Sequence, residues 1–178
     1  MILIVSGPAG TGKTTVGALV AGNMHWEFAD ADAFHTPTGI AKMRAGIPLT
    51  DDERWPWLEA IGDWIDERAA AGESGVVTCS ALRRAYRDKL LEGRPEVLMV
   101  FLDATREELH DRLSTRPGHF FPEKLLDSQL AALELPVPDE HVTVVPSNAD
   151  PGHTAEKLME MIKPEVRSGH CTALLLTA

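Results

Sequence analysis

Residues 7–14 read Gly-Pro-Ala-Gly-Thr-Gly-Lys-Thr. This stretch matches the phosphate-binding loop pattern, in which four residues separate the first glycine from Gly-Lys-Ser or Gly-Lys-Thr. The apolar residues 2–5 before it are typical of a buried parallel strand, and residues 15–24 after it are rich in Ala, Val and Leu, as in a helix. The motif therefore lies in the strand–loop–helix context that a phosphate-binding loop requires.

The chemistry of this loop predicts an ATP site. Its glycines allow the backbone to curl so that several N–H groups point at phosphate oxygens, and the start of the following helix adds positive potential. Lys13 is expected to reach the β- and γ-phosphates, and the Thr14 hydroxyl to ligate Mg²⁺, the expected cofactor. The predicted ATP-binding residues of the loop are Gly7, Pro8, Ala9, Gly10, Thr11, Gly12, Lys13, Thr14 and Thr15.

The composition is that of an ordinary globular protein. The 178 residues are 25% charged and 44% apolar, and this length predicts one domain over residues 1–166, followed by a tail, residues 167–178, to which we assign no role. The formal net charge of −10, without a basic stripe, argues against a nucleic-acid partner. We expect no membrane partner, because no apolar run approaches the ~20 residues of a membrane span. The two cysteines, Cys79 and Cys171, make no disulfide framework, which fits a cytoplasmic location.

Short apolar runs alternate with amphipathic stretches along the chain. This order predicts an α/β fold with a parallel sheet that is covered by helices on both faces. The predicted strands are residues 2–5, 27–29, 76–79, 97–102 and 142–145, and helices are expected to start near residues 13, 37, 51, 81, 105, 122 and 154. One helical stripe, expected to pack in the core rather than to form a ligand site, consists of Trp57, Leu58, Ile61, Trp64 and Ile65.

Two carboxylates follow the second predicted strand. Ligand sites in open α/β sheets lie outside the carboxyl ends of the strands, so Asp30 and Asp32 should lie beside the phosphates that the first strand delivers. One carboxylate can orient metal-bound water, and the other can accept a proton from an attacking hydroxyl. The alternative for both residues is a solvated turn or a helix cap.

A third aspartate, Asp103, ends the strand at residues 97–102. It resembles the aspartate that holds Mg²⁺ in many P-loop ATPases, but the expected sheet order places its strand on the side of the first strand away from the second. We therefore favour a turn or a cap for Asp103. The third strand ends in Cys79-Ser80 without a carboxylate, which argues against a motor-type or switch-type ATPase. The Asn-Lys-x-Asp motif of GTPases does not occur in the sequence.

Four further blocks follow the loop in order. Residues 30–35 read Asp-Ala-Asp-Ala-Phe-His, residues 46–58 read Gly-Ile-Pro-Leu-Thr-Asp-Asp-Glu-Arg-Trp-Pro-Trp-Leu, and residues 79–88 read Cys-Ser-Ala-Leu-Arg-Arg-Ala-Tyr-Arg-Asp. Residues 116–121 read Arg-Pro-Gly-His-Phe-Phe, and residues 126–129 form a Leu-x-x-Gln pattern. Together with the loop, these blocks resemble the gluconokinases of the thermoresistant type, which are P-loop kinases of small molecules related to shikimate kinase.

This resemblance implies a fold and an activity. The fold would be a three-layer P-loop NTPase of the nucleoside-monophosphate-kinase type, with a five-stranded parallel sheet and a helical lid at about residues 116–128. The activity would be transfer of the γ-phosphoryl group of ATP to the 6-hydroxyl of D-gluconate, which gives 6-phosphogluconate and ADP. The family is cytoplasmic and commonly dimeric, so a homodimer is expected.

The resemblance also distributes roles among the catalytic residues. Asp32 would be the catalytic base, Lys13 and Arg116 would stabilise the charge of the transferring group, and Thr14 with Asp30 would hold Mg²⁺, partly through water. Arg112 would contact ATP, by analogy with an arginine that packs on adenine in related small kinases.

The substrate would need cations for its carboxylate and polar groups for its hydroxyls. Arg54, together with Arg83 or Arg87, would hold the carboxylate, because an arginine fork suits that group. An ion pair of Arg54 with Asp51 or Asp52 is the competing interpretation. The set of predicted substrate-binding residues is Asp32, His35, Arg54, Ser80, Arg83, Arg87 and His119.

Several of these assignments have alternatives. His35 can pair with Asp32 instead of the substrate, and Ser80 can cap a helix that starts at Ala81. A different small hydroxy acid, such as shikimate, is the alternative substrate. However, the Gly-Gly-Gly loop that follows the third strand in shikimate kinase is absent, since Cys79-Ser80-Ala81-Leu82 stands there.

Overall fold

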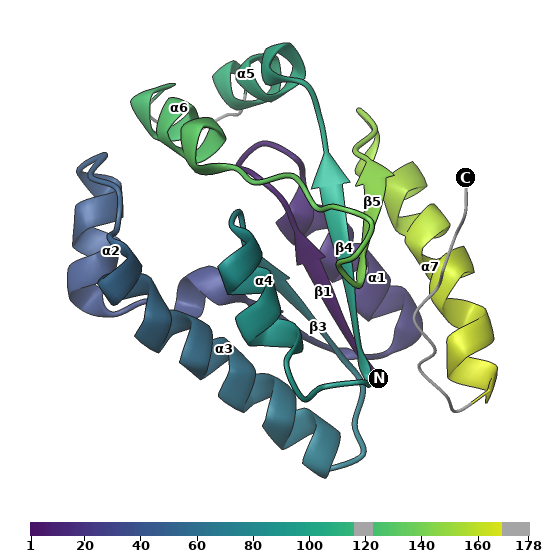
Figure 1. Cartoon of the computed structure of the whole chain (residues 1–178). Helices are drawn as coiled ribbons and strands as arrows, with labels where there is room; N and C mark the ends of the chain where they lie inside the picture. Colours follow the sequence, from purple (N-terminus) through teal and green to yellow (C-terminus); the bar gives the residue numbers. More distant parts are fainter. Residues whose placement is uncertain (116–122, 169–178) are drawn as a thin grey trace.

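The structure, a computed structural model, describes residues 1–115 and 123–168. Its five strands form one parallel sheet in the order β2-β3-β1-β4-β5 (Figure 1). The strands are β1 (Ile2–Ser6), β2 (Glu27–Asp30), β3 (Gly75–Cys79), β4 (Val97–Asp103) and β5 (Val142–Pro146). The predicted α/β fold with five parallel strands is therefore confirmed, and β4 lies on the side of β1 away from β2, as expected.

Helices connect the strands and cover both faces of the sheet (Figure 1). They are α1 (Lys13–Met24), the short 3₁₀ helix η1 (Ala31–Phe34), α2 (Pro37–Arg44), α3 (Asp51–Ala70), α4 (Arg84–Leu91), α5 (Arg106–Ser114), α6 (Glu123–Ala132) and α7 (Pro151–Ser168). Among the described residues, no helix combines the length and the apolarity that are needed to cross a membrane.

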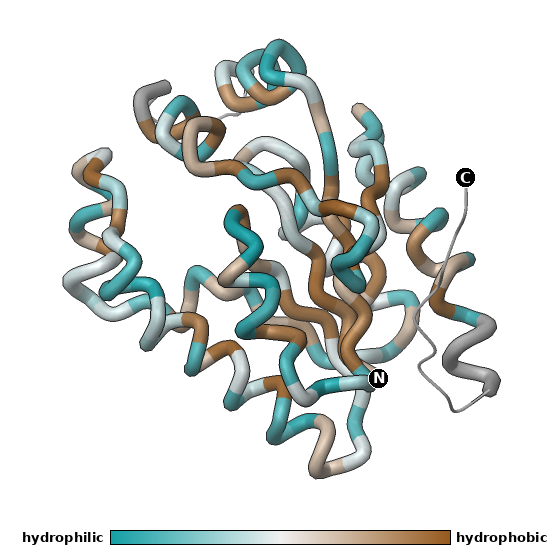
Figure 2. The backbone as a smooth tube through the Cα atoms, in the orientation of Figure 1, coloured by the Kyte–Doolittle hydropathy of each residue, from teal (hydrophilic) through white to brown (hydrophobic). Residues whose placement is uncertain are grey.

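The core consists of two apolar layers, one on each face of the sheet. On one face, Ile2 and Ile4 of β1 pack with α3 and α4, while on the other face Leu3 and Val5 pack with α1 and α7. Figure 2 shows the hydrophobic strands enclosed between the more mixed helices. Burial on both faces explains why the strands read as continuous apolar runs rather than as an alternating pattern.

The predicted stripe of α3 packs into the first of these layers. Trp57, Leu58, Ile61 and Ile65 are buried, and Trp64 packs against the same cluster with part of its surface exposed. Thr50 caps the helix in a capping box with Glu53, which satisfies backbone groups at its first turn. The core interpretation of the stripe is confirmed.

Two predicted helix starts are wrong by three residues. The helix expected near residue 154, α7, begins at Pro151. The helix expected near Ala81 begins at Arg84, because Ala81 has a left-handed φ of 39° and Arg83 is extended at φ −102° and ψ 148°. Ser80 is therefore not a helix cap, and residues 80–83 form a loop after β3. This loop carries two of the predicted substrate-binding residues, Ser80 and Arg83.

The turn after β1 depends on Gly7. Its φ is +133°, and a Cβ atom at this position would lie 2.6 Å from the carbonyl oxygen of Leu102 in β4. Its own N–H donates to the carbonyl of Ser80 at 3.2 Å. The loop can leave β1 between its two neighbouring strands only because glycine lacks a side chain.

We expect Gly7→Ala to lower the free energy of unfolding by more than Gly93→Ala. Gly93 also has a positive φ, of 74°, but a Cβ atom there meets nothing within 4 Å. The control therefore carries only the conformational cost, about 1–2 kcal/mol, whereas Gly7→Ala adds the clash with Leu102. Urea denaturation of both variants measures the difference, and equal losses would contradict the steric argument.

Candidate active site

A cavity of about 1020 Å³ lies at the carboxyl ends of the strands. Its lining comes from the phosphate-binding loop, the end of β2, helices α2 and α3, the loop after β3, and helices α5 and α6. The sequence places all of these segments far apart, and the parallel sheet brings them together at one edge. The volume is at the upper end of the usual range for small-molecule sites.

The phosphate-binding loop forms one wall of this cavity. The lining residues that the sequence predicted for ATP are Ala9, Gly10, Gly12, Lys13, Thr14 and Thr15. Gly7, Pro8 and Thr11 are not among the lining residues and instead maintain the loop, since the Thr11 hydroxyl donates to the Pro8 carbonyl at 2.9 Å. The Lys13 Nζ donates to the same carbonyl at 2.8 Å.

The two aspartates of the β2 end lie beside this loop, as the sequence predicts. The Thr14 hydroxyl donates to Asp30 Oδ2 at 2.8 Å, and the Asp32 N–H donates to Asp30 Oδ1 at 3.1 Å. Asp30 also caps η1, so one side chain both caps this helix and lies beside the phosphate-binding loop. Burial first, and the negative charge of Asp30 second, raise the pKa of Asp32, while Lys13 opposes the shift.

Thr14 and Asp30 fit the demands of a magnesium ion. Mg²⁺ keeps several waters and is usually bound through one or two protein oxygens together with substrate phosphates. A hydroxyl and a carboxylate in direct contact beside the phosphate-binding loop supply such oxygens. No group of three or more His, Cys, Asp or Glu side chains that could hold a metal occurs in residues 1–115 and 123–168, and a site of this kind does not need one.

Cationic and aromatic side chains form another part of the lining. Arg54 and Arg83 both lie over the ring of Tyr86, at 5.8 Å and 5.9 Å from its centroid. Asp51 accepts from Arg83 at 2.7 Å and from the Tyr86 hydroxyl at 2.5 Å. Arg54 instead donates from Nε to the Leu49 carbonyl at 3.2 Å. Asp51 therefore pairs with Arg83 and not, as the competing interpretation had it, with Arg54.

His35 lies against α3. Its imidazole stacks on Trp57 with ring centroids 4.4 Å apart, and the indole N–H of Trp57 donates to the Ala31 carbonyl at 2.7 Å. Burial and the charge of Arg54 lower the pKa of His35 to about 4. The side chain is therefore a neutral hydrogen-bonding group at physiological pH rather than a cation, and it lines the cavity.

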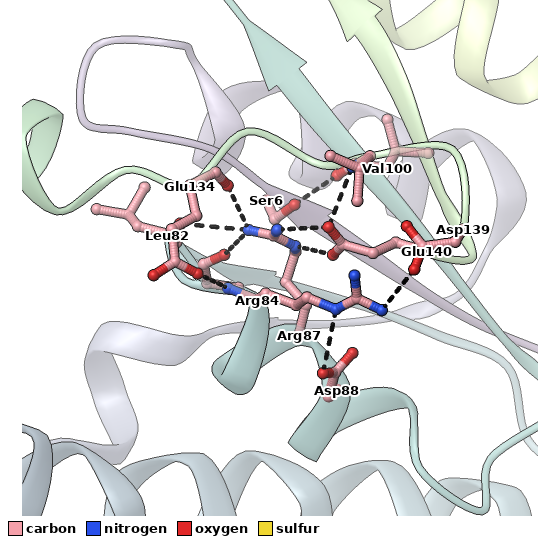
Figure 3. Close-up of polar contacts among 11 residues, drawn as sticks. Ser6, Leu82, Arg84, Arg87, Asp88, Val100, Glu134, Asp139 and Glu140 are labelled. Carbon is pink, nitrogen blue, oxygen red and sulfur yellow. Dashed lines mark hydrogen bonds and ion pairs between the residues drawn. The ribbon is translucent and has the colours of Figure 1, made fainter.

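Arg87 requires a correction. We predicted it as a substrate ligand, but its side chain is fully buried and it is not among the lining residues. Figure 3 shows its guanidinium enclosed by acceptors: Nε and Nη2 donate to the Glu140 carboxylate at 2.6 and 2.9 Å, and Nη1 donates to the carbonyls of Ala81, Leu82 and Glu134. All three nitrogens of the guanidinium thus donate to backbone carbonyls or to the Glu140 carboxylate.

The error has a clear cause. A helix that started near Ala81 would place Arg83 and Arg87, which are four residues apart, on one face, but Arg83 precedes the helix and α4 begins at Arg84. Arg83 therefore lines the cavity, whereas Arg87 donates to the segment that follows α6. Burial by itself would raise the pKa of Glu140, but the hydrogen bonds from Arg87 and from the Val137 N–H hold it below its ordinary value.

Helices α5 and α6 contribute the remaining lining. Arg112 donates to the hydroxyl of Ser147 at 2.6 Å and to its carbonyl at 3.0 Å, so it joins α5 to the loop after β5. Ser147 in turn donates to the Thr11 carbonyl at 2.9 Å. The predicted lid residues Arg116 and His119 lie outside the described residues.

Several residues that line the cavity were not predicted from the sequence. Tyr86 belongs to a quoted block but received no role, and Trp57 was assigned to the core alone, although it is both buried and part of the lining. Ser128 and Gln129 of α6 also line the cavity. The Leu-x-x-Gln pattern was the signal for Gln129, whereas only the fold reveals Tyr86, which lies between two arginines.

Comparisons with known proteins identify relatives of this chain. A protein family described as an AAA domain matches residues 2–136. A gluconokinase of Gluconobacter oxydans is 44% identical over 163 residues, which are 92% of this chain and 92% of that protein. The chain belongs to the gluconokinase family.

Solved structures of family relatives have the same fold. The crystal structure of a gluconokinase from Sinorhizobium meliloti is 40% identical with a TM-score of 0.80, and covers 94% of this gluconokinase-family chain and 95% of its own. An unliganded sugar kinase from Janibacter is 48% identical with a TM-score of 0.84, and covers 93% and 96%. Shikimate kinase from Acinetobacter baumannii, at 19% identity and a TM-score of 0.55 over 92% of this chain and 93% of its own, shares the fold alone.

The buried Arg87–Glu140 pair should contribute much more to the free energy of unfolding than the exposed Arg84–Asp139 pair beside it. We expect Glu140→Leu to lower the free energy of unfolding by about 3–5 kcal/mol, because it leaves a buried guanidinium without its counter-charge. Asp139→Leu removes the pair of Asp139 with Arg84, whose side chains are 66% and 44% exposed, and should cost under about 1 kcal/mol. Urea denaturation at neutral pH compares them, and similar losses would show that the buried pair contributes no more than the exposed one.

Proposed function

We propose that this protein transfers the γ-phosphoryl group of ATP to the 6-hydroxyl of D-gluconate, and so forms 6-phosphogluconate and ADP. The observation that carries the proposal is one cavity lined by both the phosphate-binding loop with Asp32 and the cations Arg54 and Arg83. The loop suits the triphosphate, and the arginines suit the carboxylate of a sugar acid. The gluconokinase relatives support the same substrate.

The reaction would proceed by direct attack. The 6-hydroxyl oxygen of gluconate forms a bond to the γ-phosphorus, and the bond from that phosphorus to the bridging oxygen of the β-phosphate breaks, so ADP leaves. Asp32 accepts the hydroxyl proton, and its raised pKa makes its carboxylate a stronger base than that of an ordinary aspartate. Lys13 compensates the charge on the β- and γ-phosphates.

The remaining groups would bind and orient the substrates. Arg54 and Arg83 hold the gluconate carboxylate, and the neutral His35 and Ser80 bond its hydroxyls. Thr14 and Asp30 would hold Mg²⁺, which supplies charge neutralisation at the phosphates when it is bound. Arg112 would contact the nucleotide near Ser147, and Arg116 with His119 would close over the site as a lid from about residue 116 to 128.

The organisation of the chain is part of the proposal. We place a single P-loop kinase domain at residues 1–166, and we propose that it works as a cytoplasmic homodimer without nucleic-acid or membrane partners. The support is the resemblance to gluconokinases, the acidic net charge of −10 and the small number of cysteines. Shikimate is the alternative acceptor, and it has only the shared fold in its favour.

The test is ADP release from Mg-ATP with D-gluconate, shikimate, a nucleoside monophosphate or no acceptor. We expect turnover with gluconate alone, because Arg54 and Arg83 match a linear sugar acid and the loop after β3 lacks the glycines of shikimate kinase. A rate with gluconate equal to that without an acceptor would overturn the substrate assignment and leave the P-loop fold in place.

The pH dependence should identify the base. Because Asp32 must be ionised to accept a proton and its pKa is raised, kcat/KM should fall with decreasing pH at a value above the ~3.9 of an ordinary aspartate.

Asp32→Asn should retain ATP binding and lower kcat by about 10²–10⁴-fold. His35→Gln should raise the KM for gluconate, because His35, whose pKa is lowered to about 4, is a neutral hydrogen-bonding group at physiological pH. Full turnover in Asp32→Asn would rule out this base.

A further inference from the structure

The Leu-x-x-Gln pattern of α6 has no role in the proposed reaction so far. In the structure its glutamine reaches the phosphate-binding loop: the N–H of Ala9 donates to Gln129 Oε1 at 2.8 Å. Ala9 and Gln129 both line the cavity. Helix α6, whose first residues belong to the predicted lid segment at about 116–128, therefore makes a direct hydrogen bond to the loop that is expected to bind ATP.

The contact involves the same peptide unit that holds Lys13. The Lys13 Nζ donates to the carbonyl of Pro8 at 2.8 Å, and the N–H of the same Pro8–Ala9 peptide donates to Gln129. No cis peptide occurs in the described ranges, so the C=O and N–H of this unit point in opposite directions. Gln129 therefore helps to fix the orientation of the carbonyl to which the Lys13 ammonium is bound, together with the Thr11 hydroxyl, which donates to the same carbonyl at 2.9 Å.

A buried leucine holds α6 in this position, and an exposed ion pair lies beside it. Leu126 is 3% exposed, and Asp127 pairs with Arg106 of α5 at 2.6 Å. Helix α5 also lies close to the loop. A Cβ atom on Gly10 would be only 3.2 Å from the Leu109 carbonyl oxygen. Helices α5 and α6 thus both contact the phosphate-binding loop. Within this contact, Gln129 is the residue that bonds the Pro8–Ala9 peptide, to which Lys13 is also bound.

We propose that Gln129 is a positioning residue for phosphoryl transfer. By accepting from the Ala9 N–H it holds the Pro8–Ala9 peptide, and through that peptide it sets the position of the Lys13 ammonium relative to the β- and γ-phosphates. The position of α6 then determines how well Lys13 compensates the transferring charge. This inference rests on the proposed kinase activity but not on the identity of the acceptor.

The test is a double-mutant cycle with Gln129→Met and Lys13→Met. Methionine has nearly the length of glutamine but offers only a weak acceptor to the Ala9 N–H. In the native background, Gln129→Met should weaken binding of the β,γ-imido analogue of ATP roughly 10-fold and lower kcat by a similar factor. This factor corresponds to the loss of about one hydrogen bond between the displaced Lys13 ammonium and the phosphates. The KM for gluconate should change less than about 2-fold.

The cycle separates a positioning role from a merely structural one. If Gln129 acts through Lys13, then in the Lys13→Met background the Gln129→Met change should alter analogue binding by less than about 2-fold, because interacting residues are non-additive. Full additivity would overturn the proposal. If Lys13→Met weakens the analogue beyond detection, kcat at saturating substrates completes the same cycle with the same two outcomes.

Two controls complete the design. Arg106→Gln breaks the α5–α6 ion pair, whose side chains are 65% and 46% exposed, and should change analogue affinity and kcat by less than about 2-fold. An effect equal to that of Gln129→Met would overturn the specific role of the glutamine. Thermal melting shows that each variant is folded. The binding experiment contains no gluconate, so an incorrect acceptor assignment, detected by the ADP-release panel, does not affect it.

Discussion

The site depends on the close approach of Gly7 to the backbone of both strands that flank β1. Its N–H bonds the Ser80 carbonyl after β3, and its Cα faces the Leu102 carbonyl in β4 at a distance that excludes a side chain. Because β1 is central in a parallel sheet, this turn sets where the phosphate-binding loop lies relative to the ends of β2 and β3. The pair Asp30 and Asp32 and the loop at residues 80–83 then share one cavity with the loop amides.

The electrostatics of the cavity are opposite to those of the whole chain. The protein has a formal net charge of −10, yet cations outnumber carboxylates in the cavity lining: Lys13, Arg44, Arg54, Arg83 and Arg112 stand against Asp30, Asp32 and Asp51. Protein groups contact four of these cations: Arg83 bonds Asp51, Arg112 bonds Ser147, and Lys13 and Arg54 bond the carbonyls of Pro8 and Leu49. A local cluster of this kind can attract two anionic substrates without a basic surface, because the field that a ligand experiences is dominated by nearby charges.

Arginines that are close together in the sequence have different tasks. Arg83 lines the cavity, Arg84 forms exposed pairs, and Arg87 is buried with Glu140. The Arg87 guanidinium joins the loop after β3, through the carbonyls of Ala81 and Leu82, to the segment that follows α6. The network in Figure 3 thus connects the backbone beneath the proposed gluconate site to the chain that leads from α6 into β5.

The strength of the sequence signals determined which parts of this protein were predictable. Continuous apolar runs and the Gly-rich loop were sufficient for the five strands, their parallel arrangement and the position of Asp30 beside Thr14, because these follow from local patterns and from the rules of parallel sheets. The start of α4 was not predictable, since it depends on a left-handed Ala81 that is held by Arg87 from a later helix turn. The burial of Arg87, the two arginines over Tyr86 and the bond from Ala9 to Gln129 likewise required the tertiary structure. Each joins residues whose separation in the chain carries no periodic signal, so only the packing of the helices against the sheet decides whether a given arginine meets a substrate or a buried carboxylate.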